Sequence, residues 1–466
     1  MSNISKAVAF DLSEFPSVDE ILRGETAAQF RKDIGAELTT RMIRSVIDEL
    51  KRDENYQGKK RDAITPVIER RLKEEHAAKS RSQFQCVINA TGVIIHTNLG
   101  RAPLSKQGVE AAANAARYVN LEFDLSSGER GRRGASAEAM LAQVTGAEDA
   151  LVVNNCAGAA FLMLSVFGRG GDVIVSRGEL VEIGGDFRIP DVLERSGAKL
   201  REVGTTNRTK LADYERAIAT ETKLILCVHP SNYRVVGFTE RPALSDLAEL
   251  AHRHGILLFE DAGSGAMVDL SSYGLNEPLI SDSIKAGADL VSFSGDKLMG
   301  GAQAGMIVGR KSLLHTLRKD PLYRALRPDK ITLAVTDATL RSYVRGTEFE
   351  DIPVLKFLAT GLDEIEVRAK SLVERIDRDI RSKLTLSIMK GNSTVGGGSA
   401  PGVLLPTALI AIEHNELNAD QIAKRFRNFA TPIIGRVSEG KFVIDLRTMF
   451  VEDEVAVARA FASLAT

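Results

Sequence analysis

The chain has 466 residues, enough for two or three domains, and its 44% hydrophobic and 26% charged content is that of an ordinary globular protein. A formal net charge of −1 excludes polyanion binding by bulk charge, so a nucleic acid would need a local basic patch. The three cysteines (Cys86, Cys156 and Cys227) fit a reducing compartment, and the histidines show no metal-ligand spacing. Without a signal-like N-terminus or a run of about 18 apolar residues, the sequence predicts a cytoplasmic protein with no metal and no membrane partner.

Residues 1–85 are predicted to form a helical N-terminal domain. Between residues 39 and 81, apolar side chains recur at helical spacing, as at Met42, Val46, Ile47 and Leu50. The same stretch carries more basic than acidic residues, with dense groups at 59–61 and 70–73. It is either a solvated arm with charge pairs along its helices or a surface that contacts a phosphate backbone.

A predicted strand and a polar turn occupy residues 87–103. The turn carries His96 and Arg101, and arginine is suited to bidentate capture of a phosphate-like anion. A second Gly- and Arg-rich segment, residues 128–134, is predicted to be a flexible loop or a solvated turn.

Residues 150–167 have the pattern of a phosphate-binding turn. The apolar strand 150–153 runs into the small or polar residues Asn155, Cys156 and Ala157, and a helical stretch follows. The main-chain N–H groups and the dipole of a helix N-terminus bind phosphate in such turns.

Strands and helices alternate beyond this turn, which predicts a mostly parallel sheet with helices on both faces. The apolar run 256–259 ends near Asp261, at the carboxyl end of a strand, where open α/β sheets place ligands. A carboxylate there can hold a pyridinium nitrogen protonated. His229 follows the strand at 223–228 and fits either a cofactor contact or a polar strand end.

The stretch from 288 to 309 is centred on Lys297. Two apolar runs, 290–293 and 306–308, are predicted strands, and Ser294 with several glycines leaves room for a flat ring between them. A buried lysine is costly unless it is paired or chemically used, and lysines form Schiff bases with aldehyde cofactors. Alone, the pattern fits equally well a surface-loop lysine between two hairpin strands.

A phosphate turn, an acid and a lysine thus follow one another, each at a strand end. This order predicts pyridoxal 5'-phosphate in an α/β, aminotransferase-like large domain at residues 86–330, with a mostly parallel sheet. Residues 331–466 are predicted to form a linker helix and a smaller C-terminal α/β domain. Its expected features include separate strands at 403–405 and 409–412 and a loop at 394–399.

Several motifs are spread from about residue 85 to the C-terminus. They lie at residues 89–103, 176–185, 231–238, 292–301, 432–437 and 445–447. Together they resemble the motifs of bacterial selenocysteine synthase, the L-seryl-tRNA(Sec) selenium transferase family. The helical segment before residue 85 is similar in character to the N-terminal domain with which that family grips tRNA.

The resemblance implies a fold-type I pyridoxal phosphate enzyme. It implies conversion of L-seryl-tRNA(Sec) to L-selenocysteinyl-tRNA(Sec), in which selenium from selenophosphate replaces the seryl hydroxyl through an aminoacrylyl-tRNA. Members of the family are ring-shaped homo-oligomers, a decamer in the bacterial case. The implied partners are therefore serine-charged tRNA(Sec), selenophosphate and further copies of the chain, and no DNA.

The resemblance also assigns roles to individual residues. Lys297 is implied as the Schiff-base lysine, Asp261 as the partner of the ring nitrogen, and Asp296 as a catalytic-site acid beside the lysine. The positions that bind the anionic group of the selenium donor match Arg101, Arg324 and Arg327.

Two other functions stay open at the level of sequence. One is a pyridoxal phosphate-dependent lyase or aminotransferase acting on a free amino acid or a phosphorylated amino sugar, with the basic arm as a solvated or oligomer-building element. The other is a non-enzymatic tRNA-binding relative. Lys297 and Asp261 argue against the second, because a pure binder has no use for either residue.

Overall fold

A computed structural model describes residues 14–56, 59–80, 84–183 and 187–465. The chain divides into two compact units, Met1–Cys86 and Val87–Thr466. Among the described residues, no helix is both long and apolar enough to cross a lipid bilayer.

The first unit is a small helical bundle. Its helices are α1 (Val18–Arg23), α2 (Glu25–Ile34), α3 (Ala36–Arg52) and α4 (Arg61–Ser80). The helical character predicted for this segment is therefore confirmed as far as Ser80. The apolar positions of α3 face a common core with those of α2 and α4, made mainly by Phe30, Met42, Ile43, Ile47, Leu50, Ile64, Ile68 and Leu72.

The second unit is built on a seven-stranded sheet with the order β3-β11-β10-β9-β8-β4-β7. All strands are parallel except β11, which pairs antiparallel with both of its neighbours. The strands are β3 (Asp149–Val153), β4 (Asp172–Ser176), β7 (Lys199–Val203), β8 (Thr222–Val228), β9 (Leu257–Asp261), β10 (Leu290–Ser294) and β11 (Gly305–Gly309). The predicted α/β class with a mostly parallel sheet is confirmed.

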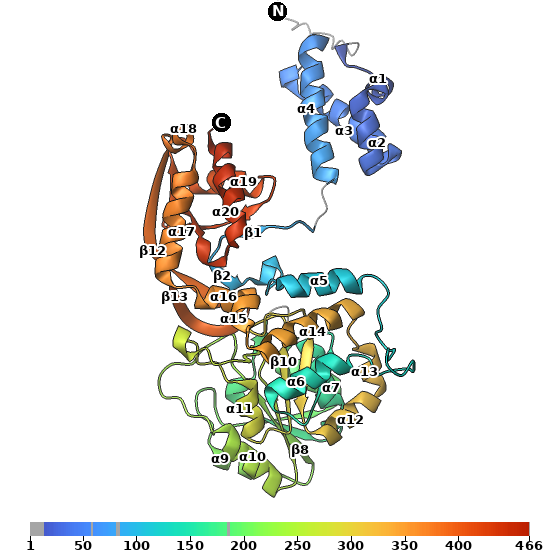
Figure 1. The fold of residues 1–466 in the computed structure, drawn as a ribbon, viewed down its shortest axis with the longest axis vertical. Helices are drawn as coiled ribbons and strands as arrows, with labels where there is room; N and C mark the ends of the chain where they lie inside the picture. The colour runs from blue at the N-terminus through green and yellow to red at the C-terminus, as the bar shows by residue number, and fades with distance from the viewer. Residues whose placement is uncertain (1–13, 57–58, 81–83, 184–186, 466) are drawn as a thin grey trace, which may run out of the picture. The chain divides into compact units, whose positions relative to one another are not determined.

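Helices cover both faces of this sheet, as Figure 1 shows. Along β8, Leu224 and Leu226 pack into a core shared with α7, α8 and α12, whereas Ile225 and Cys227 pack into a core shared with α9 and α10. This alternation follows from the two-residue period of a strand. The helices of this layer are α5 (Lys106–Ala115), α6 (Ala135–Thr145), α7 (Cys156–Phe167), α8 (Ile189–Ser196), α9 (Leu211–Ala217), α10 (Leu244–Arg253), α11 (Ile280–Lys285), α12 (Lys311–Lys319), α13 (Pro321–Ala325) and α14 (Lys330–Arg345).

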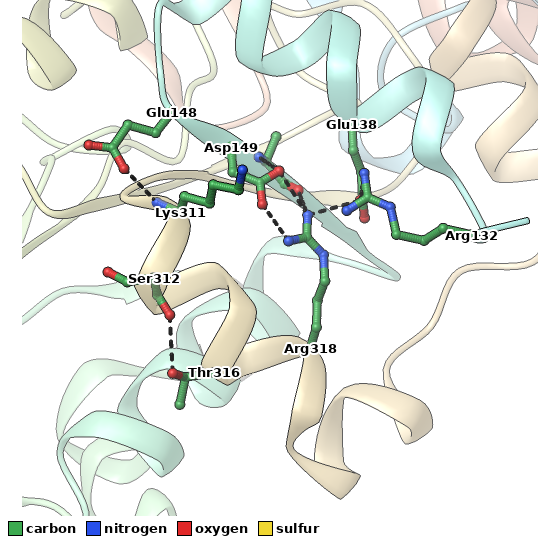
Figure 2. Close-up of polar contacts among 9 residues, drawn as sticks. Arg132, Glu138, Glu148, Asp149, Lys311, Ser312, Thr316 and Arg318 are labelled. Carbon is green, nitrogen blue, oxygen red and sulfur yellow. Dashed lines mark hydrogen bonds and ion pairs between the residues drawn. The ribbon is translucent and has the colours of Figure 1, made fainter.

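A partly buried ion-pair network ties three of these elements together (Figure 2). Arg318 on α12 binds both oxygens of Asp149, at the start of β3, and lies 3.0 Å from Oε2 of Glu138 on α6. Arg132 approaches the same Glu138 oxygen at 3.3 Å. Burial raises the pKa of Glu138 despite both arginines. Burial acts in the same direction on Asp149, but its hydrogen bonds from Arg318 and the Ala150 N–H leave its pKa lowered.

The second sheet has the order β15-β16-β13-β12-β2. Its strands are β2 (Val93–Ile95), β12 (Leu384–Gly396), β13 (Ser399–His414), β15 (Arg436–Ser438) and β16 (Lys441–Asp445), and a separate pair joins β1 (Ile88–Asn89) to β14 (Ile433–Ile434). The remaining elements are β5 (Glu182–Ile183), β6 (Phe187–Arg188), α15 (Glu348–Asp351), α16 (Pro353–Ala359), α17 (Leu362–Arg375), α18 (Arg378–Arg381), α19 (Ala419–Arg427) and α20 (Glu454–Ala460).

Two sequence predictions for this sheet are wrong. The runs at 403–405 and 409–412 are not separate strands, because the antiparallel ladder with β12 continues through Pro406. The predicted loop at 394–399 belongs largely to the same hairpin, whose tight turn centres on Gly397 and Gly398. Local composition suggested breaks that long-range strand pairing overrides.

Candidate active site

The candidate site lies where three parallel strands end side by side. Val228 of β8 is paired with Asp261 of β9, and Asp261 is paired with Ser292 of β10. The residues directly after these strands, including His229 and Lys297, are therefore brought to one edge of the sheet, as expected for ligand binding in open α/β sheets.

Lys297 is buried, with 6% of its surface exposed, and two glycines, Gly263 and Gly398, lie close to its amine. A Cβ at Gly263 would lie 3.7 Å from Nζ of Lys297, and one at Gly398 would lie 3.6 Å from it. Within the described part of the chain, Nζ takes part in no hydrogen bond or ion pair. A buried amine that the protein leaves without a partner is available for chemistry.

Asp261 ends β9 and is 4% exposed. Its Oδ1 accepts hydrogen bonds from the Cys156 thiol at 3.5 Å and the Ser292 hydroxyl at 3.3 Å. Burial raises the pKa of Asp261, and the nearby Lys297 amine and these two hydrogen bonds offset only part of that effect. A cation placed against this carboxylate would complete its environment.

Asp296 holds Arg101 in the site. Nη1 of Arg101 donates to Oδ2 of Asp296 at 2.8 Å, and the Ser294 hydroxyl donates to Oδ1 at 2.7 Å. Arg101 has a φ of 64°, unusual for a residue with a side chain, and its N–H donates to the His96 carbonyl. Such a backbone conformation is typically held in place at functional sites.

The N-terminus of α7 faces the same region. Asn155 caps the helix, because its side chain accepts a hydrogen bond from the Gly158 N–H. The N–H groups of Cys156 and Ala157 lie in the first turn, where helical N–H groups have no intrahelical acceptor. The buried Oδ1 of Asn154 also has no hydrogen-bond partner among the described residues.

His229 follows β8 and faces Glu277. Its Nδ1 lies 3.7 Å from Oε2 of Glu277, and both atoms are buried without a hydrogen-bond partner in the described chain. Sequence reasoning missed Glu277. It lies in an irregular segment, and no motif or periodicity marks it, so only the folded chain reveals it.

Arg324 and Arg327 flank the end of α13, and neither is bonded to the residues around Lys297 in the described chain. Arg324 is exposed, whereas Arg327 lies over the Tyr323 ring at 5.2 Å, with a buried Nε that lacks a partner there. Between them, the Leu326 carbonyl accepts a hydrogen bond from the Asn154 N–H. This contact places the arginine segment beside the α7 turn.

These residues fit pyridoxal phosphate. Within the described ranges, Lys297 offers an unpaired amine near a buried carboxylate. Gly263 brings no side chain against either group, and a helix N-terminus presents N–H groups without intrahelical acceptors to a phosphate. No group of three or more His, Cys, Asp and Glu side chains arranged to hold a metal ion occurs within the described ranges.

Comparison with known proteins identifies close relatives over nearly the whole chain. Residues 87–450 match the family model described as L-seryl-tRNA selenium transferase, and residues 12–50 match that described as selenocysteine synthase N terminal. The L-seryl-tRNA(Sec) selenium transferase of Geobacter sulfurreducens is 42% identical over 458 residues, covering 97% of this chain and 99% of that protein. The enzyme of the same name from Clostridium perfringens is 45% identical and covers 97% and 98%.

Among solved structures, D-glucosaminate-6-phosphate ammonia-lyase matches with a TM-score of 0.57 and 19% identity, over 82% of this chain and 96% of that one. At this identity the likeness concerns the fold. It agrees with the aminotransferase-like architecture that the order of motifs predicts.

Proposed function

The chain belongs to the L-seryl-tRNA selenium transferase family, and we propose that it converts L-seryl-tRNA(Sec) to L-selenocysteinyl-tRNA(Sec). The observation that carries this proposal is the family match across residues 87–450, which includes every residue of the candidate site. The reaction replaces the β-hydroxyl of the tRNA-borne serine with selenium.

The cofactor of this reaction is pyridoxal 5'-phosphate, which when bound supplies an electron sink for the negative charge that develops at the serine Cα. Lys297 would hold the aldehyde of the cofactor, and Asp261 would pair with its ring nitrogen. The first turn of α7, with Asn155, Cys156 and Ala157, would receive its phosphate. His229 and Ser294 complete the lining, although the Ser294 hydroxyl is also engaged by Asp296.

Lys297 also moves the proton. Its buried Nζ would take the Cα proton of the bound seryl group, and the β-hydroxyl would then leave. Asp296, bonded to Arg101 at 2.8 Å, keeps a guanidinium close to this reaction and is the catalytic-site acid beside the lysine.

The selenium donor is selenophosphate, held by Arg101, Arg324 and Arg327. Guanidinium groups present several N–H donors to a tetrahedral anion. Two features support this assignment: the buried Nε of Arg327 has no partner among the described residues, and the Leu326–Asn154 contact brings this segment to the α7 turn.

The helical unit, residues 1–85 in the proposed division, grips the tRNA. Lys59, Lys60, Arg71 and Lys73 are exposed and take part in no ion pair in the described chain, so their charges are free for phosphates. Residues 86–330 form the cofactor-binding domain and residues 331–466 the linker helix and small domain.

The protein is proposed to work in the cytoplasm as a homo-oligomer, a decamer as in the bacterial enzymes of this family. Large apolar side chains on the second unit support association, because a monomer rarely leaves such groups in water. The most exposed of them are Tyr118, Leu125, Val236 and Phe238.

A binding titration tests the proposed substrate. The purified protein, loaded with cofactor, is titrated with serine-charged tRNA(Sec) and with ordinary seryl-tRNA at one stated salt concentration, and selenium transfer from selenophosphate is then assayed. We expect tighter binding and selenium incorporation with tRNA(Sec) alone. Equal or absent binding, together with turnover of a free amino acid, would overturn the proposal in favour of a lyase or aminotransferase.

A further inference from the structure

The strongest unexplained feature next to the site is the pair His229 and Glu277. Nδ1 of His229 and Oε2 of Glu277 are 3.7 Å apart, too far for a hydrogen bond, yet both are buried and have no other partner in the described chain. Leaving two such atoms unsatisfied is costly. Hydrogen bonds in ligand-free sites are often long and shorten when the ligand binds.

The other oxygen of Glu277 holds a second part of the site. Oε1 accepts a hydrogen bond from the Ala400 N–H at 2.7 Å. Ala400 has a φ of 48° and follows the glycine turn in which Gly398 approaches Nζ of Lys297. A non-glycine residue at positive φ needs such support from its surroundings. Glu277 therefore contacts both His229, at the end of β8, and the hairpin turn over Lys297.

Several charges act on the His229 imidazole. Burial lowers the pKa of His229, the Glu277 carboxylate opposes this, and Arg241 and Lys297 add to the lowering. The neutral imidazole is consequently the form present near pH 7. With a carboxylate facing Nδ1, its proton belongs on that nitrogen, and Nε2 is left as an acceptor.

We propose that Glu277 is a positioning residue: one oxygen fixes the tautomer and orientation of His229, and the other anchors the turn that closes over Lys297. This inference rests on the proposed function for its catalytic consequence. Glu277 lies outside every motif of the sequence. Through it, the loop at 275–279 contacts both His229 and the hairpin turn beside Lys297.

The contact can be measured without cofactor or tRNA. The rate of diethyl pyrocarbonate modification at His229, followed by peptide mass spectrometry across pH, reports the pKa of that imidazole. In Glu277→Gln we expect the midpoint to fall by about one pH unit, because the charge that favours the imidazolium is gone. Glu240→Gln is the matched control, because Glu240 lines the same cavity as His229 and Glu277 but pairs with Arg208. We expect the His229 midpoint in this variant to equal that of the wild type.

Turnover gives the second readout. Glu277→Gln is expected to lower kcat for selenium transfer about tenfold in the wild-type background, the usual size of an outer positioning effect, and less than about twofold in a His229→Asn background. Glu277→Asp, which keeps the charge, should restore the His229 midpoint even if the glutamine variant folds poorly.

An unchanged His229 midpoint in Glu277→Gln, no restoration by Glu277→Asp, or full additivity with His229→Asn would each overturn the proposal. Absence of selenium transfer by the wild-type chain would instead count against the proposed function. The modification experiment then still decides whether Glu277 controls His229.

Discussion

Two groups of charged residues, one partly buried and one buried, lie at opposite edges of the same mostly parallel sheet. At the amino edge, Arg318 satisfies both Asp149 and Glu138 (Figure 2). At the carboxyl edge, Lys297 has no partner in the described chain and Asp261 has only a thiol and a hydroxyl. Buried charges that are paired specify and hold a structure, whereas buried groups left incomplete mark the place of a ligand.

The largest effect on turnover is expected at Lys297, in the incomplete site at the carboxyl edge. In Lys297→Ala we expect selenium transfer to fall by about 10⁴-fold or more, because both the proposed attachment point of the cofactor and the proposed base for the Cα proton are lost. The visible absorbance of the bound cofactor should disappear as well. Lys311→Ala, which removes an exposed lysine of the same unit, is the control and should keep both. Retained turnover in the alanine variant would contradict the assignment.

The next largest effect is expected at Asp261. If Asp261 has its proposed role, Asp261→Asn should lower turnover about 100-fold, since an amide cannot hold the ring nitrogen protonated. The same change should raise the free energy of unfolding of the cofactor-free protein at neutral pH by about 1 kcal/mol, because it removes a carboxylate whose burial the Lys297 amine offsets only in part. Steady-state turnover measures the first effect, and urea unfolding of the cofactor-free protein measures the second.

The pH dependence of that stability difference has a definite sign. The pKa of Asp261 is raised in the folded chain, so the folded state binds this proton more tightly than the unfolded state. The stabilisation of the folded state by this proton is therefore complete below the unfolded pKa of about 3.9. It is lost as pH rises through the pKa of Asp261 in the folded chain. The advantage of Asp261→Asn should grow across this window and level off above it. A constant difference would show that the carboxylate is not buried as described.

At the opposite edge, Arg318→Met should affect stability and leave chemistry intact. The change leaves Asp149 without its arginine and Glu138 with Arg132 alone, and because Asp149 and Arg318 are only partly buried we expect a cost of about 1–3 kcal/mol. Arg341→Met, at the more exposed pair with Asp337, should cost less than about 1 kcal/mol. Urea unfolding checks both, and turnover per folded molecule should equal that of the wild type. A selective loss of turnover in Arg318→Met would remove the distinction between the two edges.

A smaller change is expected at the anion site. Arg327→Ala should raise KM for selenophosphate about tenfold while the absorbance of the bound cofactor stays unchanged, because one charge-assisted contact to the donor is lost. Steady-state kinetics at saturating tRNA measures this. Loss of cofactor in the variant would assign Arg327 a structural role beside Tyr323 instead.

The smallest test concerns the cysteines. A helix N-terminus normally lowers the pKa of a thiol. Burial and the Asp261 carboxylate instead raise the pKa of Cys156, and Lys297 offsets this only in part. In the cofactor-free protein, iodoacetamide near pH 8 should therefore modify the exposed Cys86 at least about tenfold faster than Cys156, as mass spectrometry would show. Rapid reaction at Cys156 would mean that the α7 turn is open to solvent.

The sequence by itself determined where the central strands of this protein end. Asn155, Asp261 and Lys297 each follow a short apolar strand, and a strand pattern is local, so their placement at strand ends was predictable from neighbouring residues. Their order along the chain, together with the family motifs, led to the α/β fold with a mostly parallel sheet.

Only the tertiary structure decided which distant residues meet. Glu277 contacts Ala400 across 123 positions, and Arg101 reaches Asp296 across 195, with no local pattern that announces either pair. The long hairpin β12–β13 also differs from the sequence prediction, because the ladder of hydrogen bonds between its two strands overrides the breaks suggested by glycine and proline. Local periodicity encodes elements, whereas the pairing of those elements and the burial of their charges arise only when the chain has folded.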